Sequence, residues 1–376
     1  MGDRQGPMEV LVTGAAEWRG RRVFVTGHTG FKGSWLALWL HKLGAKVTGF
    51  ALPPPTDPSL FRAARLDELI THVEGDVRDL VAVTAAMAAA RPEVVFHLAA
   101  QPLVRLSYDQ PVETYAVNVM GTVHVLEAVR RLGGVGAAIC ITTDKCYENR
   151  EWVWPYRETD PMGGYDPYSS SKGAAELAIA AYRRSFFRNG ATGVASVRAG
   201  NVIGGGDWAA DRLIPDLVRA FEAGVAPEIR SPNAVRPWQH VLEALGGYLL
   251  IAERLMAGEH AFADAWNFGP ADDDARPVSW IVDRMRAAWG NAAAAAVPFI
   301  GSVPHEAGLL RLDCSKARAM LGWRPALGLD ATLQWIVDWH KAVADGVDAR
   351  DVTSSQIMNY SCRAKPLGIY QGYIPY

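Results

Sequence analysis

The chain has 376 residues, of which 49% are hydrophobic and 21% are charged, and its formal net charge is −2. This length suits one large α/β domain or two lobes. The near-neutral charge excludes the broad basic surface that binding to nucleic acid or to an anionic membrane requires. An anionic ligand must therefore be met by a few placed cations.

The cysteines and the apolar runs restrict the cell compartment and the kind of site. Cys140, Cys146, Cys314 and Cys362 are scattered, without a CxxC pair or the histidine spacing of a zinc site, so we expect no metal. Nowhere do 18 uncharged apolar residues follow one another, which predicts neither a signal peptide nor a membrane span. A cytoplasmic location is the expectation.

In chain order, short apolar or β-branched runs alternate with longer helical segments. The runs occupy residues 23–27, 46–52, 93–99, 137–143 and 193–199. Such an alternation is typical of a parallel sheet that is covered by helices on both faces. We therefore predict a Rossmann-like, doubly wound α/β fold.

The composition changes after Asn201 to loops rich in glycine and proline. This change predicts a dinucleotide-binding domain over 1–200 and a smaller C-terminal substrate-binding lobe over 201–355. A return segment near 237–275 is expected to rejoin the first sheet, and the tail 356–376 carries no role that we can assign.

A glycine-rich turn follows the first predicted strand. The letters Val-Thr-Gly occur at 12–14 and at 25–27, but only the second copy continues as TGHTGFKG (26–33) into an apolar helix. Gly27 permits a tight turn, Gly30 lets the backbone approach a pyrophosphate, and Gly33 lets the helix pack on the strand. The second copy is the predicted dinucleotide site.

The residues after the second strand bear on the choice between NAD and NADP. That strand ends at Phe50-Ala51-Leu52, without the acid that often holds the ribose hydroxyls of NAD. No basic cluster follows for a 2′-phosphate, so we predict NAD, although Lys32 and Arg62 do not settle the choice. Asp76 either accepts from the adenine amino group or is an ordinary turn aspartate.

A second cluster suits the chemistry of an alcohol. Tyr168 and Lys172 are one helical turn apart, so the ammonium is expected to lower the pKa of the phenol and make it a base. Thr143, at the end of its strand, is placed to hold the same oxygen.

These motifs resemble the extended short-chain dehydrogenase/reductase family over roughly residues 20–350. The resemblance rests on TGHTGFKG (26–33), HLAAQ (97–101), Asn118, the strand end at Thr143 and YSSSK (168–172). It implies a triad of Thr143, Tyr168 and Lys172. The implied cofactor-binding set is Gly27, Thr29, Gly30, Phe31, Lys32, Asp76, Val77, Leu98, Ala99, Ala100, Tyr168 and Lys172.

Within that family, longer phrases resemble the CDP-glucose 4,6-dehydratases of deoxysugar biosynthesis. They are GHTGFKGSWL, TTDKCYEN, GNVIGGGDW and RPWQHV. The resemblance implies oxidation at C4, loss of water across C5 and C6, and hydride return to C6. Asp144 is then the acid. Lys145 stands where related dehydratases commonly carry Glu, and it is either a neutral C5 base or a charged group that polarises an oxygen.

The resemblance also implies substrate contacts and a partner. Asn201, Arg212 and Arg236 match positions that bind the sugar diphosphate, whereas Trp208 either stacks on the base or fills the interface between the lobes. Helices near 110–131 and 167–189 correspond to the family's homodimer interface. Two rival functions remain, a sugar-nucleotide 4-epimerase and a non-catalytic dinucleotide-sensing protein.

Overall fold

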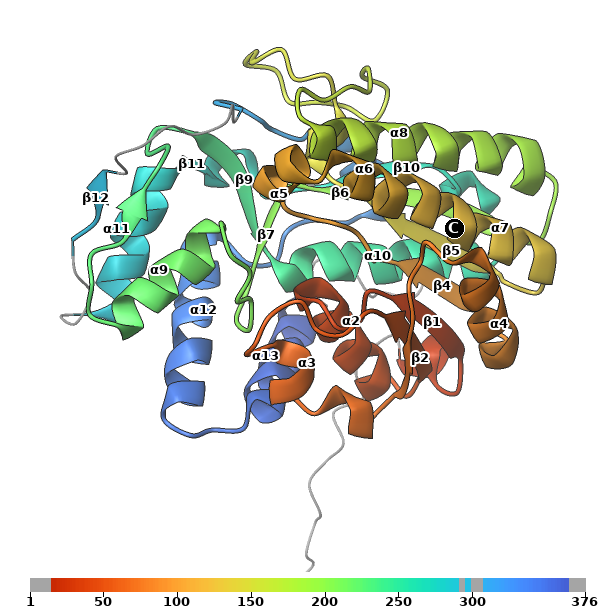
Figure 1. Ribbon diagram of the computed structural model, residues 1–376, viewed down its shortest axis with the longest axis horizontal. Helices are drawn as coiled ribbons and strands as arrows, with labels where there is room; N and C mark the ends of the chain where they lie inside the picture. The colour runs from red at the N-terminus through yellow and green to blue at the C-terminus, as the bar shows by residue number, and fades with distance from the viewer. Residues whose placement is uncertain (1–14, 291–294, 299–306, 365–376) are drawn as a thin grey trace, which may run out of the picture.

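The computed structural model describes residues 15–290, 295–298 and 307–364 (Figure 1). The first Val-Thr-Gly (12–14), the remainder of 1–14 in the predicted dinucleotide-binding domain, and residues 365–376 of the predicted tail lie outside the described residues.

A parallel sheet of seven strands forms the centre of the first lobe, in the order β10-β6-β5-β4-β1-β2-β3. Its strands are β1 (Arg22–Thr26), β2 (Lys46–Ala51), β3 (Thr71–Glu74), β4 (Val94–His97), β5 (Ala137–Ile141), β6 (Gly193–Ala199) and β10 (Ala265–Phe268). Every neighbouring pair is parallel. The predicted Rossmann-like fold is confirmed, and the chain returns to the sheet edge at β10.

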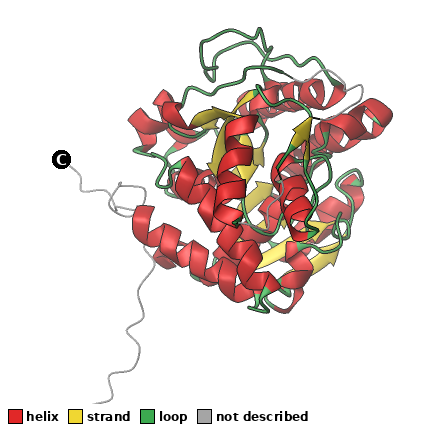
Figure 2. Cartoon of the chain, turned by 90° about the vertical axis from the view of Figure 1, so that its left-hand side faces the viewer, coloured by secondary structure: helices red, strands yellow, loops and turns green. Residues whose placement is uncertain are grey.

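Helices cover both faces of this sheet because alternate side chains of its buried strands point to opposite sides. Val23 and Val25 of β1 join one hydrophobic cluster with α2 (Phe31–Lys42) and α10 (Val241–Met256). Phe24, between them, joins a second cluster with residues of α4 (Leu80–Ala90), α7 (Gly121–Leu132) and α8 (Pro167–Tyr182). Figure 2 shows the strands enclosed between layers of helix.

The second lobe is built on two small sheets. The larger has the order β11 (Ala275–Pro277), β9 (Val235–His240), β7 (Asn201–Ile203), and the smaller pairs β12 (Val297–Pro298) with β8 (Glu228–Ile229). Helices α9 (Leu213–Glu222), α11 (Val278–Trp289) and α12 (Leu329–Ala344) pack around a third hydrophobic cluster.

The remaining helices are α1 (Ala15–Trp18), α3 (Leu60–Ala63), α5 (Val104–Asp109), α6 (Pro111–Tyr115) and α13 (Ala349–Ala364). Residues 356–364 of the predicted tail form the end of α13, where Tyr360 lies edge-on against Trp39 and donates a 2.9 Å hydrogen bond to Glu243. This part of the tail is therefore packed on the first lobe. No helix in the described ranges has both the length and the apolar character to cross a bilayer.

Candidate active site

The glycine-rich turn between β1 and α2 is fixed by close backbone packing. Gly27 has a φ of +74°, and a Cβ atom there would lie 2.6 Å from the backbone nitrogen of Ala99. A Cβ atom at Gly33 would lie 2.1 Å from the carbonyl oxygen of Gly27. Only glycine fits at these two positions, because a side chain at Gly27 would collide with the backbone after β4 and one at Gly33 would push α2 away from the turn.

Gly30 has a different role in the same turn. It precedes α2 as a helix cap without a capping side chain, and a Cβ atom there would meet only the Gly27 carbonyl oxygen, at 3.5 Å. The Cα atom that precedes the first backbone N–H groups of α2 is therefore uncrowded. This leaves room for a phosphate to bind those N–H groups. These residues fit a dinucleotide pyrophosphate.

The other predicted cofactor residues surround this turn. The Thr29 hydroxyl donates a 2.9 Å hydrogen bond to the Leu52 carbonyl, which joins the turn to the end of β2. Leu98, Ala99 and Ala100 follow β4 directly, and the backbone nitrogen of Ala99 donates to Thr26 at 3.2 Å. The glycine-rich turn and the residues Leu98, Ala99 and Ala100 therefore lie at the carboxyl ends of adjacent parallel strands, where this fold binds ligands.

Asp76 and Val77 lie after β3. Asp76 accepts hydrogen bonds from Nε of Arg78 at 2.8 Å and from the Arg78 backbone nitrogen at 2.9 Å. The hydrogen bond from the Arg78 side chain lowers the pKa of Asp76. The carboxylate thus makes the contacts of an ordinary turn aspartate, and its contact with adenine stays a prediction. Val77 is buried against Gly121 of α7.

Tyr168 and Lys172 lie in the first turns of α8. The helix begins with Asp166 as its cap, which accepts from the Ser169 backbone nitrogen at 2.9 Å, and with Pro167 as its first residue. Tyr168 and Lys172 are 8% and 6% exposed. Tyr168 and Lys172, which are neighbours on one face of α8, are thus both buried.

Burial dominates the protonation of this pair. It raises the pKa of Tyr168 to about 12, against a lowering by the Thr143 hydroxyl and by the charge of Arg212. It lowers the pKa of Lys172 to about 8, against a raising by the charge of Glu176. The expectation of a phenol pKa near neutrality is wrong for this geometry, because desolvation of the phenolate outweighs the Thr143 hydroxyl and the charge of Arg212.

Thr143, Asp144 and Lys145 follow β5 and form a short turn, Asp144–Cys146. The Thr143 hydroxyl donates to Oδ1 of Asp144 at 3.0 Å. Oδ2 of Asp144 is buried and has no hydrogen-bond partner in the described part of the chain. Burial raises the pKa of Asp144, which makes the protonated acid more accessible at neutral pH.

A buried network holds the two reactive segments together. Asn118 accepts from the Gln101 backbone nitrogen at 2.9 Å and donates to the Ser171 hydroxyl at 2.9 Å, which joins the segment after β4 to α8. Behind Lys172, Glu176 accepts from Arg198 at 2.8 Å and from the Thr142 hydroxyl. Fixed positions of this kind favour a site that does chemistry.

A cavity of about 290 Å³ extends from the reactive cluster into the second lobe. Its wall includes Thr143, Asp144, Lys145 and Tyr168, and also Phe31 and Lys32 from the cofactor turn. Burial, together with the charges of Lys172 and Arg212, lowers the pKa of Lys32 to about 7. The side chain of Lys32 therefore faces the reactive cluster.

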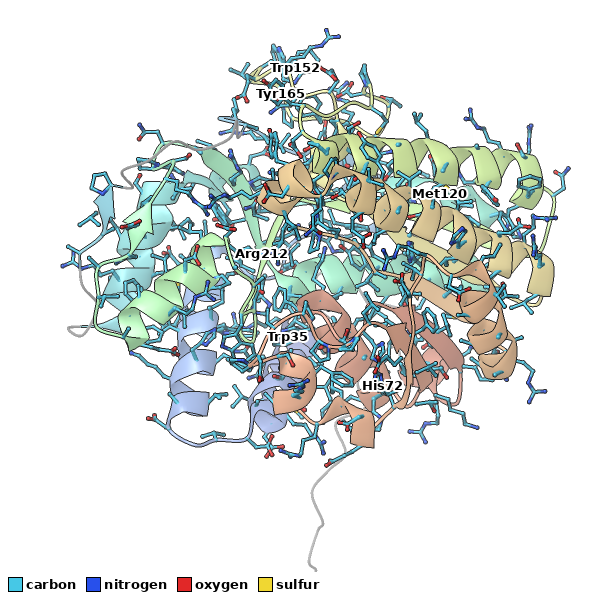
Figure 3. The ribbon with its side chains drawn as sticks, viewed as in Figure 1. Trp35, His72, Met120, Trp152, Tyr165 and Arg212 are labelled. Atoms are coloured by element: carbon cyan, nitrogen blue, oxygen red, sulfur yellow. The ribbon has the colours of Figure 1, made fainter. Side chains whose placement is uncertain are left out.

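The predicted substrate residues divide into two groups. Asn201, Arg212 and Arg236 line the cavity; Arg212 lies centrally between the lobes (Figure 3) and pairs with Asp207 at 3.1 Å. Arg236 is 6% exposed and donates to the carbonyl oxygen of Val235 at 3.1 Å. Trp208, by contrast, is absent from the residues that line the cavity and lies edge-on to Trp339 with ring centroids 5.7 Å apart. The structure favours the packing role for Trp208.

Sequence reasoning missed several residues of the cavity wall. Arg105, Asp207, Glu228 and Arg230 belong to it. Glu176 was also missed, although its spacing of four from Lys172 on a helix was a usable signal. Glu228 belongs to a strand too short to give a periodic pattern, and Arg230 follows that strand directly.

Comparisons with known proteins place the chain in a family. A sequence model described as GDP-mannose 4,6 dehydratase matches residues 24–335. A CDP-glucose 4,6-dehydratase of Salmonella typhimurium strain LT2 is 56% identical over 348 residues, which cover 91% of this chain and 97% of that protein. A dTDP-glucose 4,6-dehydratase of Streptomyces antibioticus is 27% identical and covers 85% of this chain and 92% of its own.

A solved structure of MoeE5 in complex with UDP-glucuronic acid and NAD aligns with a TM-score of 0.70 and 26% identity, over 85% of this chain and 99% of its own. The fold, the cofactor turn and these matches agree. The chain belongs to the GDP-mannose 4,6-dehydratase family of extended short-chain dehydrogenase/reductases.

Proposed function

We propose that the protein is an NAD-dependent CDP-glucose 4,6-dehydratase, a lyase that forms CDP-4-keto-6-deoxyglucose. One observation carries the proposal beyond the fold: the buried Oδ2 of Asp144, without a hydrogen-bond partner in the described chain, belongs to the same cavity wall as Tyr168. An acid beside the oxidation triad is what dehydration adds to simple oxidation. The 56% identity to the Salmonella protein supports the same substrate.

Oxidation at C4 uses the groups on β5 and α8. Tyr168 takes the proton of the C4 hydroxyl, while Thr143 holds the oxygen that becomes the ketone. The Thr143 hydroxyl and the charge of Arg212 favour the phenolate that accepts this proton, which matters because burial alone disfavours that charge. NAD, held along the glycine-rich turn, would supply the hydride acceptor for oxidation at C4 and the hydride donor for reduction at C6.

Dehydration uses Asp144 and Lys145, the two residues that follow Thr143 in the chain. The 4-ketone acidifies the hydrogen at C5, and Lys145 removes that proton or polarises the neighbouring oxygen. Asp144 donates a proton to the C6 oxygen, which leaves as water, and its raised pKa suits this role. With Lys145 as the base, it returns the proton to C5 as the hydride reaches C6, and the proton held by Tyr168 passes to Asp144, so each group ends in its starting protonation state.

The substrate diphosphate needs local cations because the chain as a whole is near neutral. Arg212 and Arg236 line the cavity beyond the reactive cluster and supply them. Asn201, on β7, adds a polar group on the same wall.

Incubation of the purified protein and NAD with CDP-, UDP-, GDP- and dTDP-glucose tests the proposal. We expect a product lighter by one water and carrying a ketone, formed fastest from CDP-glucose. A product of unchanged mass with inverted C4 would favour the 4-epimerase instead. Binding of NAD without any change in the sugar would favour the dinucleotide-sensing protein.

We further propose a cytoplasmic homodimer. Helices α6, α7 and α8 lie side by side at the surface, and Val112 of α6 and Leu177 of α8 are apolar side chains with 82% and 61% exposure. Phe186, in the helical turn after α8, is 54% exposed. In the related family the equivalent helices form the dimer. The four cysteines are free thiols, which is in keeping with a reducing compartment. The mass in solution, measured by light scattering, tests the dimer.

A further inference from the structure

At the end of the cavity away from the reactive cluster, strand β8 contributes one acidic residue, Glu228. Glu228 and buried Ile229 form β8, which pairs with β12 in the second lobe. In Figure 1, β12 lies at the far left, whereas α8 runs along the top, right of centre. Tyr168 belongs to the first turn of α8. Arg212 lies between these two regions in Figure 3.

This arrangement orders the parts of a nucleotide sugar along the cavity. The sugar must reach Tyr168 and Asp144, and the diphosphate must meet the cations Arg212 and Arg236. The nucleoside then extends toward β8, because the diphosphate separates it from the sugar. Glu228 lines the cavity beside this end.

Glu228 is unusual in its surroundings because the neighbouring cations are already paired. Arg230 donates to Asp211 at 2.9 Å, and Arg105 donates to the same carboxylate at 2.7 Å. Arg219, on α9, pairs with Asp216. In the described ranges, the Glu228 carboxylate has neither an ion pair nor a hydrogen bond.

A carboxylate with no partner weakens the binding of an anionic ligand unless it accepts a hydrogen bond from that ligand. Cytosine presents an exocyclic amino group, which carboxylates accept from in base recognition. Uracil and thymine present a carbonyl oxygen at the same position, which repels a carboxylate. One side chain can thus both attract the correct base and disfavour the wrong ones.

We propose that Glu228 reads the nucleobase by accepting a hydrogen bond from the amino group of cytosine. This inference rests on the proposed function, since it takes a nucleotide sugar as the ligand. Glu228 acts on specificity alone, because it lies away from the reacting atoms.

Calorimetric binding of CDP and UDP to the NAD-loaded protein tests the proposal. The wild type is expected to prefer CDP by on the order of tenfold or more. Glu228→Gln should reduce that preference at least severalfold, since an amide can donate to the uracil oxygen. Glu222→Gln is the matched control: it removes the same charge from the same lobe, at an exposed position outside the cavity wall.

Kinetics give a second readout. Glu228→Gln should raise KM for CDP-glucose and lower it for UDP-glucose while kcat for CDP-glucose stays near the wild-type value. An unchanged CDP preference in this variant would overturn the proposal. So would GDP binding as tight as CDP that weakens in Glu228→Gln, because the carboxylate would then read guanine.

The two proposals fail in different ways. Selective CDP binding that depends on Glu228, without a keto product, would overturn the dehydratase and keep the base reader. A keto product from CDP-glucose with unchanged selectivity in Glu228→Gln would do the reverse.

Discussion

Glu176 lies one helical turn beyond Lys172 on α8 and accepts a 2.8 Å hydrogen bond from Arg198, with both partners of this ion pair less than 5% exposed. The charge of Glu176 opposes the lowering of the Lys172 pKa by burial. The pair with Arg198 keeps the carboxylate ionised, as its own lowered pKa indicates.

Glu176→Gln should therefore lower the pKa of Lys172 below about 8. Because turnover needs the ammonium, the alkaline limb of the kcat/KM profile should move to lower pH. A pH profile separates this effect from simple loss of folded protein, which would reduce activity at every pH alike. An unmoved alkaline limb would remove Glu176 from the account of Lys172.

Tyr168→Phe should abolish turnover while leaving NAD and CDP binding largely intact, because it removes only the titrating oxygen. The ring itself remains and keeps its packing in the cavity wall. Turnover and equilibrium binding are measured on the same preparation. Turnover near the wild-type rate would exclude Tyr168 as the C4 base.

Asp144→Asn and Lys145→Met should separate oxidation from dehydration. Both leave Tyr168, Lys172 and Thr143 in place, so the first hydride transfer stays possible and the later steps stall. In a single turnover with stoichiometric NAD and CDP-glucose, absorbance of the reduced nicotinamide should accumulate while keto product falls by ~10²–10⁴-fold.

The wild type should also incorporate solvent deuterium at C5 of the product. If both variants form product at the normal rate, Asp144 and Lys145 are a structural pair, and a 4-epimerase becomes the better description.

Alanine substitutions at Gly30 and Gly33 should have different consequences, one for NAD binding and the other for stability. Gly33→Ala places a Cβ atom 2.1 Å from the Gly27 carbonyl oxygen, so it should lower the melting temperature. Gly30→Ala makes only a 3.5 Å contact, so it should fold normally and lose NAD affinity. Thermal unfolding and NAD titration of both variants check this contrast, and normal NAD binding by Gly30→Ala would move the pyrophosphate elsewhere.

Glu243 should make stability depend on pH. Burial raises its pKa to about 7, against hydrogen bonds from Leu327, Tyr360 and Ala326. The folded protein therefore holds a proton that the unfolded chain releases nearer its ordinary value of 4.5, so stability falls as pH rises through this window. Glu243→Gln should flatten the dependence of melting temperature on pH between 4.5 and about 7, whereas an equal slope in both proteins would contradict it.

The sequence predicted the central strands well because strands buried on both faces read as continuous apolar runs. It also predicted that Thr143, Tyr168 and Lys172 lie near one another, because helical spacing and the end of a strand determine their positions. It did not find Glu228 or the adjacent Arg230, because the two-residue strand β8, which ends just before Arg230, pairs with a strand that is distant in the chain. It misjudged the pKa of Tyr168, because the burial of a phenol depends on tertiary packing.

The pairing of β10 with β6 constrains how the protein can be made. All seven residues of β6 are buried, and β10 supplies its outer neighbour only after the chain has passed through much of the second lobe. A ribosome-bound intermediate that ends before residue 265 thus presents an apolar strand edge, the kind of surface that recruits chaperones or pairs with other nascent chains. Premature stop codons before β10 should accordingly yield insoluble protein, not a free-standing cofactor-binding fragment.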